Sequence, residues 1–308
     1  MREKNQKTIK SQVNFSGIGL HSGIKTNLSL RPAKANHGVV FKRVDLDKNN
    51  EILANYANVS SAKLCTKIEN NFGNGVSTIE HLMAAIYICG IDNLTIEIDG
   101  PEVPIMDGSA KDFYEVISKC GSITQNEKRK FIKIIKKINL NESGKSISIE
   151  PSENNFSVDF TLSYKNPLIK TQSNKINFQE KDLENIYSAR TFCLFEDIEK
   201  IKEIGLAKGG SLENAIVVKE DKVLNKGGLR NKKEFVNHKI LDLAGDFMLA
   251  GYRVIGSVKC EHGGHELTNN FLKKVLSDNS NFTITENSFS SSNTRKVIAF
   301  PKRLVVNA

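Results

Sequence analysis

The sequence has few cysteines and no long hydrophobic run. Its five cysteines are Cys65, Cys89, Cys120, Cys193 and Cys260. Their odd number and the lack of a CxxC pair argue against a disulfide framework and against a cysteine-rich zinc cluster. No stretch approaches the roughly 18 apolar residues of a membrane span, and residues 82–91 are typical of a core helix. The charged N-terminal segment is not followed by an apolar core, so we expect no secretory signal and a cytoplasmic protein with reduced thiols.

Basic residues outnumber acidic ones, and the net charge is +9. A basic balance favours anionic partners, which include nucleic acids, phosphorylated small molecules and acidic membrane surfaces. The densest basic run, residues 128–137, partly alternates basic and apolar residues, as a strand with one solvated face does. Because no nucleic-acid-binding motif accompanies this run, we expect no nucleic-acid partner.

Residues 237–247, NHKILDLAGDF, place His238, Asp242 and Asp246 at a spacing of four. On a helix, residues four apart lie on one face, so an imidazole and two carboxylates point the same way. Apolar residues fill the other positions, which predicts a largely buried helix. Buried charge needs a partner, and imidazole with carboxylate is a common set of zinc ligands. A buried His–Asp hydrogen bond explains the spacing equally well, and this helix alone leaves both interpretations open.

Two further histidines have neighbours that suit a metal site. Residues 76–91 predict a helix in which Ser77 and Glu80 form a capping box, and His81 follows directly. There the histidine can bind a metal while the glutamate acts as a general base on water. His265 follows two glycines, which free the backbone to bring it close to a site. A capping glutamate, a core histidine and a surface histidine are the competing interpretations, and the absence of HExxH excludes a thermolysin-type protease.

Strand patterns precede helix patterns in each half of the chain, which predicts two α+β domains. The polar residues 121–127 resemble a linker, so we expect one domain over 1–126 and a second over 127–308. Within the second domain, residues 195–204 predict an amphipathic helix, and a glycine-rich turn connects it to a strand over 215–219.

Six segments together resemble one enzyme family over nearly the whole chain. They are TIEHLMAA (78–85), GPEVPIMDGSA (100–110), SARTF (188–192), GGSLENAIVV (209–218), NHKILDLAGD (237–246) and GGHELTNN (263–270). Their order and spacing are similar to those of the zinc-dependent UDP-3-O-acyl-N-acetylglucosamine deacetylases of lipid A biosynthesis. Several motifs of this length are far more specific than one HxxxD spacing. The resemblance implies two similar domains, each a layered unit of sheet and helix, with the active site between them.

The resemblance also implies roles for residues of the site. The residues that correspond to zinc ligands are His81, His238 and Asp242. Glu80 corresponds to the general base that activates water. His265, supported by Asp246, corresponds to the imidazolium that stabilises the oxyanion and protonates the leaving amine. Thr191 corresponds to a hydroxyl donor to the oxyanion. The resemblance as a whole implies Zn²⁺ as the cofactor and hydrolysis of an N-acetyl group as the reaction.

Expected substrate contacts follow from the same resemblance. Lys239 corresponds to a basic contact near the anionic part of the substrate, and Phe192 to a packing contact. Residues 192–218 correspond to an insert that forms an apolar passage for the acyl chain. Three residues are expected in this passage: Ile198, Leu206 and Ala215. His262 departs from the family, whose members carry Lys or Arg there facing the diphosphate, and because histidine is only partly charged at neutral pH we expect weaker binding of the nucleotide phosphates.

The expected substrate is a nucleotide-sugar lipid precursor, handled by a cytoplasmic monomer with transient contact to the inner-membrane surface. A zinc amidase for another N-acyl sugar is the first alternative, since it would share the metal site without requiring the nucleotide or the acyl chain. A basic protein that binds nucleic acid or membrane surfaces without a metal is the second, and strongly salt-dependent binding to polyanions would reveal it.

Overall fold

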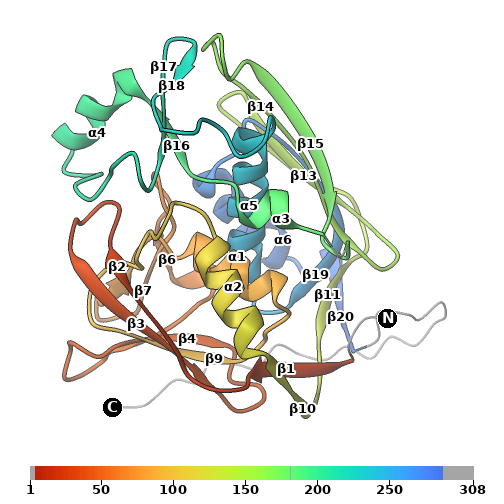
Figure 1. Ribbon diagram of the computed structural model, residues 1–308. Helices are drawn as coiled ribbons and strands as arrows, with labels where there is room; N and C mark the ends of the chain where they lie inside the picture. The colour runs from red at the N-terminus through yellow and green to blue at the C-terminus, as the bar shows by residue number, and fades with distance from the viewer. Residues whose placement is uncertain (1–3, 181, 287–308) are drawn as a thin grey trace.

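A computed structural model describes residues 4–180 and 182–286 of the chain (Figure 1). Within these residues the strands form five sheets, two of them large, and the long helices lie between the two large sheets. Residues 287–308 of the expected second domain lie outside the described residues. The fold is of the α+β class, as the strand and helix patterns predict.

The first half of the chain builds a five-stranded sheet in the order β2-β3-β9-β4-β5. Its strands are β2 (Val13–Ile18), β3 (Lys25–Pro32), β4 (Val39–Arg43), β5 (Glu51–Leu53) and β9 (Leu94–Ile98). Alternate residues of β9 are fully buried, as expected for a sheet with one covered face. Helices α1 (Glu80–Ile88) and α2 (Lys111–Cys120) lie on this sheet, and Phe113 of α2 packs against Phe15 of β2 with 5.0 Å between the ring centroids.

The second half repeats this arrangement. Its strands are β12 (Ile138–Glu142), β13 (Lys145–Glu150), β19 (Arg253–Glu261), β14 (Phe156–Ser163) and β15 (Thr171–Asn177). They pair in the same order and with the same relative directions as β2, β3, β9, β4 and β5. Strands β11 (Phe131–Ile134) and β20 (Phe282–Thr285) extend this sheet. Helix α5 (Glu234–Met248) precedes β19 and α6 (His265–Leu276) follows it, just as α1 and α2 flank β9, so the two halves are similar layered units, as expected.

Short elements complete the described chain. They are β6 (Val59–Ser61), β7 (Lys67–Glu69), β8 (Gly75–Val76), α3 (Glu184–Tyr187), β16 (Phe192–Leu194), α4 (Ile198–Glu203), β17 (Ile216–Lys219) and β18 (Lys222–Val223), with 3-10 turns at Tyr56–Asn58, Phe195–Asp197 and Asn279–Asn281. The amphipathic helix expected over 195–204 is present as a 3-10 turn followed by α4, and the strand expected over 215–219 is β17. Figure 1 shows these two elements projecting together at one corner of the molecule.

The polar segment expected to be a linker is a strand instead. β10 (Ser122–Lys128) pairs antiparallel with β1 (Asn5–Ile9), and most of its residues are exposed. Polar composition does not distinguish a linker from an exposed strand, because only the backbone pairing differs, and the buried residues of this ribbon lie on β1. The domain division between residues 126 and 127 falls within this ribbon and stays a prediction.

Helices α1 and α5 pack against each other at the centre of the molecule (Figure 1). A Cβ atom on Gly245 of α5 would lie only 2.1 Å from the carbonyl oxygen of Glu80 in α1. Glycine is therefore the residue that permits this close approach. Among the described helices, none combines the length and the apolarity that a membrane span requires.

The expected capping box at the start of α1 is wrong. Ile79 occupies the N-cap position without a side-chain hydrogen bond, and Thr78 before it has a left-handed φ of 56°. The Thr78 hydroxyl donates to the buried carboxylate of Glu102 over 2.7 Å. Ser77 bonds through its backbone to residues 101 and 103 of the following loop. Tertiary contacts therefore override the local Ser-x-x-Glu pattern.

Candidate metal centre

Helices α1 and α5 bring together three ligand-type side chains from distant parts of the sequence. His81 lies in the first turn of α1, and His238 and Asp242 lie one turn apart on α5. Asp242 Oδ1 is 3.5 Å from His81 Nε2 and 3.3 Å from His238 Nε2. One ligand atom from each residue lies within 4.8 Å of the other two, and all three residues are buried. The convergence that the sequence predicts is therefore present.

This donor set fits a metal ion. Neither Asp242 Oδ1 nor His81 Nδ1 has a hydrogen-bond partner within the described part of the chain, although both atoms are buried. His238 Nδ1 lies 3.0 Å from the carbonyl oxygen of Ala189, so Nδ1 donates and Nε2 keeps its lone pair for a metal. Burial lowers the pKa of His238 to about 3, which keeps the ring in its neutral, metal-binding form. A bound cation would satisfy the unpaired carboxylate oxygen.

Lys239 lies on the other side of the Asp242 carboxylate. Its ammonium donates to Oδ2 over 2.8 Å and lies 5.7 Å from the ring centroid of Phe192. Burial alone would raise the pKa of Asp242, but the surrounding imidazoles and Lys239 hold it well below its ordinary value. The carboxylate is therefore ionised, as a cation ligand must be. The expected contact of Lys239 with substrate stays a prediction.

Glu80, His265 and Asp246 form a second group beside the ligands. His265 Nδ1 lies 2.8 Å from Asp246 Oδ2, and His265 Nε2 lies 3.5 Å from Glu80 Oε1. Burial raises the pKa of Glu80. Burial alone would lower the pKa of His265, but the carboxylates of Asp246 and Glu80 outweigh it and raise the pKa to about 10. Shifts of this kind in neighbouring groups are typical of residues that take part in acid–base catalysis.

Thr66, which no sequence pattern indicates, holds both carboxylates in place. Its hydroxyl donates to Asp246 Oδ1 over 2.6 Å, and its backbone N–H donates to Glu80 Oε2 over 3.1 Å. Glu80 therefore bonds to the chain before α1 instead of capping that helix. His265, which follows the two glycines, is the first residue of α6. A single threonine between short strands has no spacing that would identify it.

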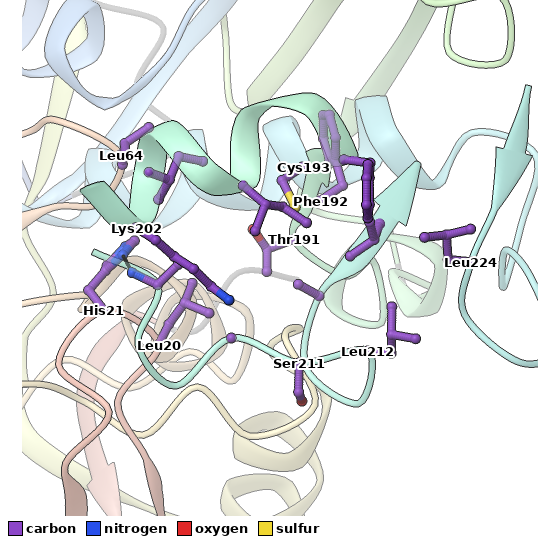
Figure 2. Close-up of a pocket in the computed structure, with 17 residues that line it drawn as sticks. Leu20, His21, Leu64, Thr191, Phe192, Cys193, Lys202, Ser211, Leu212 and Leu224 are labelled. Atoms are coloured by element: carbon purple, nitrogen blue, oxygen red, sulfur yellow. Dashed lines mark hydrogen bonds between the residues drawn. The ribbon is translucent and has the colours of Figure 1, made fainter. Parts of the chain in front are cut away.

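An apolar pocket of about 430 Å³ lies beside these groups (Figure 2). Four residues singled out from the sequence line it: Thr191, Phe192, Ile198 and Ala215. Leu206 is not part of the lining, whereas its neighbour Ala207 is. Figure 2 shows Leu20 and His21 on one side of the pocket and Leu224 on the other. The part that Leu20 and His21 take in the pocket is a finding of the structure.

Phe192 lines the pocket and also lies near His238 of the candidate metal centre. Its ring centroid lies 4.9 Å from that of Phe235 and 6.4 Å from that of His238. His262, in contrast, is exposed in the turn between β19 and α6, where it has a left-handed φ of 56°. Its backbone N–H donates to the carbonyl of Thr161 over 2.9 Å. The expected contact of His262 with substrate phosphates stays a prediction.

Two imidazoles and a carboxylate that converge on one point, beside a buried Glu–His pair, are a donor set typical of hydrolases that use a metal ion. Comparison with protein families narrows this class. Residues 6–277 match the model of the UDP-3-O-acyl N-acetylglycosamine deacetylase family. The chain belongs to this family of deacetylases.

Proteins named UDP-3-O-acyl-N-acetylglucosamine deacetylase are similar to most of the chain. The one from Geobacter sp. (strain M21) is 44% identical over 282 residues, which cover 91% of this chain and 92% of that protein. The one from Myxococcus xanthus (strain DK1622) is 43% identical over 281 residues, which cover 91% and 89%. The one from Aliivibrio fischeri (strain ATCC 700601 / ES114) is 41% identical over 276 residues, which cover 89% and 90%.

Proposed function

We propose that this protein uses Zn²⁺ to hydrolyse the N-acetyl group of UDP-3-O-(3-hydroxyacyl)-N-acetylglucosamine, a step of lipid A biosynthesis that releases acetate and leaves a free amine. The observation that carries the proposal is a His–His–Asp set next to both an acid–base pair and an apolar pocket of about 430 Å³. Two histidines and one carboxylate are a common ligand set of catalytic zinc. The names of the relatives indicate the substrate.

Each residue of the site has a task in this reaction. The ligands that would hold the ion are His81, His238 and Asp242. When bound, the ion supplies Lewis acidity to the acetyl carbonyl and to water. Glu80 accepts a proton from the attacking water, whose oxygen bonds to the carbonyl carbon. His265, held by Asp246, donates a proton to the leaving nitrogen as the C–N bond breaks.

The remaining residues would bind the substrate and its oxyanion. The Thr191 hydroxyl would donate to the oxyanion, and one such donor is worth about 3–4 kcal/mol. Lys239 and His262 would face the anionic part of the substrate, and Phe192 would pack against it. The pocket would take the acyl chain, because each buried methylene contributes about 0.8 kcal/mol. Leu206, next to the pocket lining, would contact the chain where it leaves the pocket.

We further infer that the protein works as a monomer in the cytoplasm and touches the inner-membrane surface only transiently. All five cysteines are free, which suits a reducing compartment. The catalytic site would lie between a domain over 1–126 and a domain over 127–308, since α1 supplies one ligand and α5 supplies two. A zinc amidase for another N-acyl sugar is the alternative, and it would not need the pocket.

Metal content and hydrolysis of the acylated UDP sugar, measured on the same samples, test the proposal. We expect about one zinc per chain. His238→Ala is expected to lose metal and activity together, whereas His265→Ala is expected to keep the metal and lose most of the rate. Ala215→Phe is expected to raise the KM for the acylated substrate more than the KM for UDP-N-acetylglucosamine. Equal cleavage of both substrates by the unmodified protein would favour the alternative amidase, and near-full activity of His265→Ala would contradict its role as the acid.

A further inference from the structure

A buried ion pair, Arg190–Glu234, lies behind the metal ligand His238 and has no task in the reaction above. Glu234 is the first residue of α5, one helical turn before His238, and is fully buried. The side chain of Arg190 is 11% exposed, and its Nε donates to Glu234 Oε1 over 2.8 Å. Removing two charges from water costs several kcal/mol per ion, so the pair calls for a reason other than stability.

The Glu234 carboxylate collects donors from two segments of the chain. Its Oε1 accepts the backbone N–H of Arg190 over 3.2 Å, and its Oε2 accepts Arg190 Nη2 over 3.2 Å. Oε2 also accepts the backbone N–H of Arg230 over 2.6 Å. Arg190 Nη2 reaches the carbonyl of Gly228 as well, over 2.8 Å. One carboxylate thereby ties the start of α5 to residues 188–192 and to the turn before the helix.

Residues 188–192 carry two groups that matter to the site. The Ala189 carbonyl lies 3.0 Å from His238 Nδ1, which fixes the tautomer and the rotation of that ring. Thr191 provides the proposed oxyanion donor, and its backbone N–H donates to Gly108 over 2.7 Å. Ala189 and Thr191 are the two neighbours of Arg190, so any displacement of Arg190 moves both groups.

We propose that the Arg190–Glu234 pair is a positioning element for the reaction. It sets residues 188–192 in register against α5, and thereby aims the His238 ring at the metal and the Thr191 hydroxyl at the oxyanion. This inference rests on the proposed function. The planar guanidinium is required, because a lysine ammonium is a point charge that does not span both carboxylate oxygens and the Gly228 carbonyl at once.

Arg190→Lys tests the proposal, with Arg129→Lys as a matched control. Arg129 also forms an ion pair, in which its side chain and that of Asp92 are 8% and 15% exposed. Its Nη2 donates to the Gly90 carbonyl, just beyond the end of α1 that is remote from the metal ligands. Both substitutions keep a positive charge but lose the paired hydrogen bonds of a guanidinium to a carboxylate, so both are expected to lower thermal stability. Co²⁺ affinity, the visible spectrum of bound Co²⁺, kcat and KM then separate the two variants.

For Arg190→Lys we expect Co²⁺ binding to weaken by about 10–100-fold, with an altered spectrum, as for other groups that orient a metal ligand. We expect kcat to fall by about 10–100-fold, since small displacements of catalytic groups have effects of this size, while KM changes by less than about threefold. Arg129→Lys is expected to keep the Co²⁺ affinity, the spectrum and kcat of the unmodified protein. In the double variant with Thr191→Ala, kcat should fall by less than the product of the two single effects, because both act on one hydroxyl.

Equal changes in Co²⁺ affinity and kcat for the two lysine variants would overturn the proposal. Strictly multiplicative effects with Thr191→Ala would overturn its oxyanion part. Glu234→Gln, which keeps the size of the side chain, repeats the comparison if the arginine variant does not fold. If the unmodified protein does not hydrolyse the acylated UDP sugar, the proposed function fails, whereas the Co²⁺ affinity and spectrum still decide whether the pair orients His238.

Discussion

Replacing Gly245 by alanine is expected to pull the metal ligands apart. The added Cβ would lie 2.1 Å from the carbonyl oxygen of Glu80 and 2.9 Å from its carbonyl carbon. Close carbon–oxygen contacts in proteins are about 3.3 Å or longer, so α1 must move away from α5 by roughly 1 Å. No side chain can rotate out of the way, because the opposing atoms are helix backbone. His81 moves with α1, whereas the other two ligands stay on α5.

Metal binding should suffer more than folding. Overpacking costs about 1–3 kcal/mol, and the better helix propensity of alanine returns about 1 kcal/mol, which leaves a net loss of about 0–2 kcal/mol in the free energy of unfolding. Metal–ligand distances tolerate only about 0.2 Å. A misplacement of about 1 Å in a catalytic group can lower the rate about 100-fold, so kcat is expected to fall by that order.

Zinc retained after dialysis against a chelator, kcat and thermal unfolding separate these effects. Ala244→Gly is the control, since Ala244 is also buried in α5 and its loss costs about 1 kcal/mol of helix propensity without adding an atom against α1. We expect the control to lose stability and keep its zinc, and Gly245→Ala to lose its zinc and most of its rate. A Gly245→Ala protein with normal zinc content and kcat would refute the reasoning.

Three further predictions concern other parts of the molecule. Asp92→Asn is expected to lower the free energy of unfolding by about 3 kcal/mol, because it leaves the buried Arg129 without a carboxylate partner. Denaturant unfolding measures this loss, and the double variant with Arg129→Met should recover part of it. Burial would raise the pKa of Asp107, but hydrogen bonds, among them one from Arg230, lower it. A carboxyl group with a lowered folded-state pKa stabilises the protein above its unfolded pKa, and this stabilisation is lost as the pH falls through the folded pKa. Asp107→Asn should therefore be less stable than the unmodified protein at neutral pH, with a difference that shrinks as the pH falls below about 4; thermal unfolding at several pH values would show a constant difference if this is wrong. His262→Lys is expected to lower the KM for the UDP substrate, because a lysine carries a full positive charge at neutral pH. A KM unaffected by this substitution would count against a phosphate contact.

The close approach of His238 and Asp242 on α5 could be predicted because a helix converts sequence spacing into spatial position. His238 and Asp242 share a face for that reason alone. The spacing did not distinguish a metal site from a buried His–Asp hydrogen bond, because the difference lies in His81, which reaches them only through the packing of α1 on α5. The resemblance to a family supplied this long-range information, and local patterns did not contain it.

The predicted capping box and the predicted linker are wrong for the same physical reason: hydrogen bonds to distant parts of the chain override the local pattern. The Ser77-x-x-Glu80 pattern predicted a cap, but the Glu80 carboxylate instead accepts the backbone N–H of Thr66, which lies between β6 and β7. The polar residues 121–127 predicted a linker, but they pair with β1. Arg190 and Glu234 are likewise unremarkable in the sequence, since an arginine and a glutamate in separate segments show no periodicity that would mark them as partners.

The division of the ligands between the two repeats has a consequence for biosynthesis of the protein itself. When the first repeat leaves the ribosome, α1 offers a single imidazole, which is too little to retain an ion. The complete set arises only after α5 has been translated and has docked on α1. Under the proposed function, a nascent or truncated polypeptide without α5 is therefore expected to hydrolyse no substrate, and activity requires that both halves of the chain have assembled.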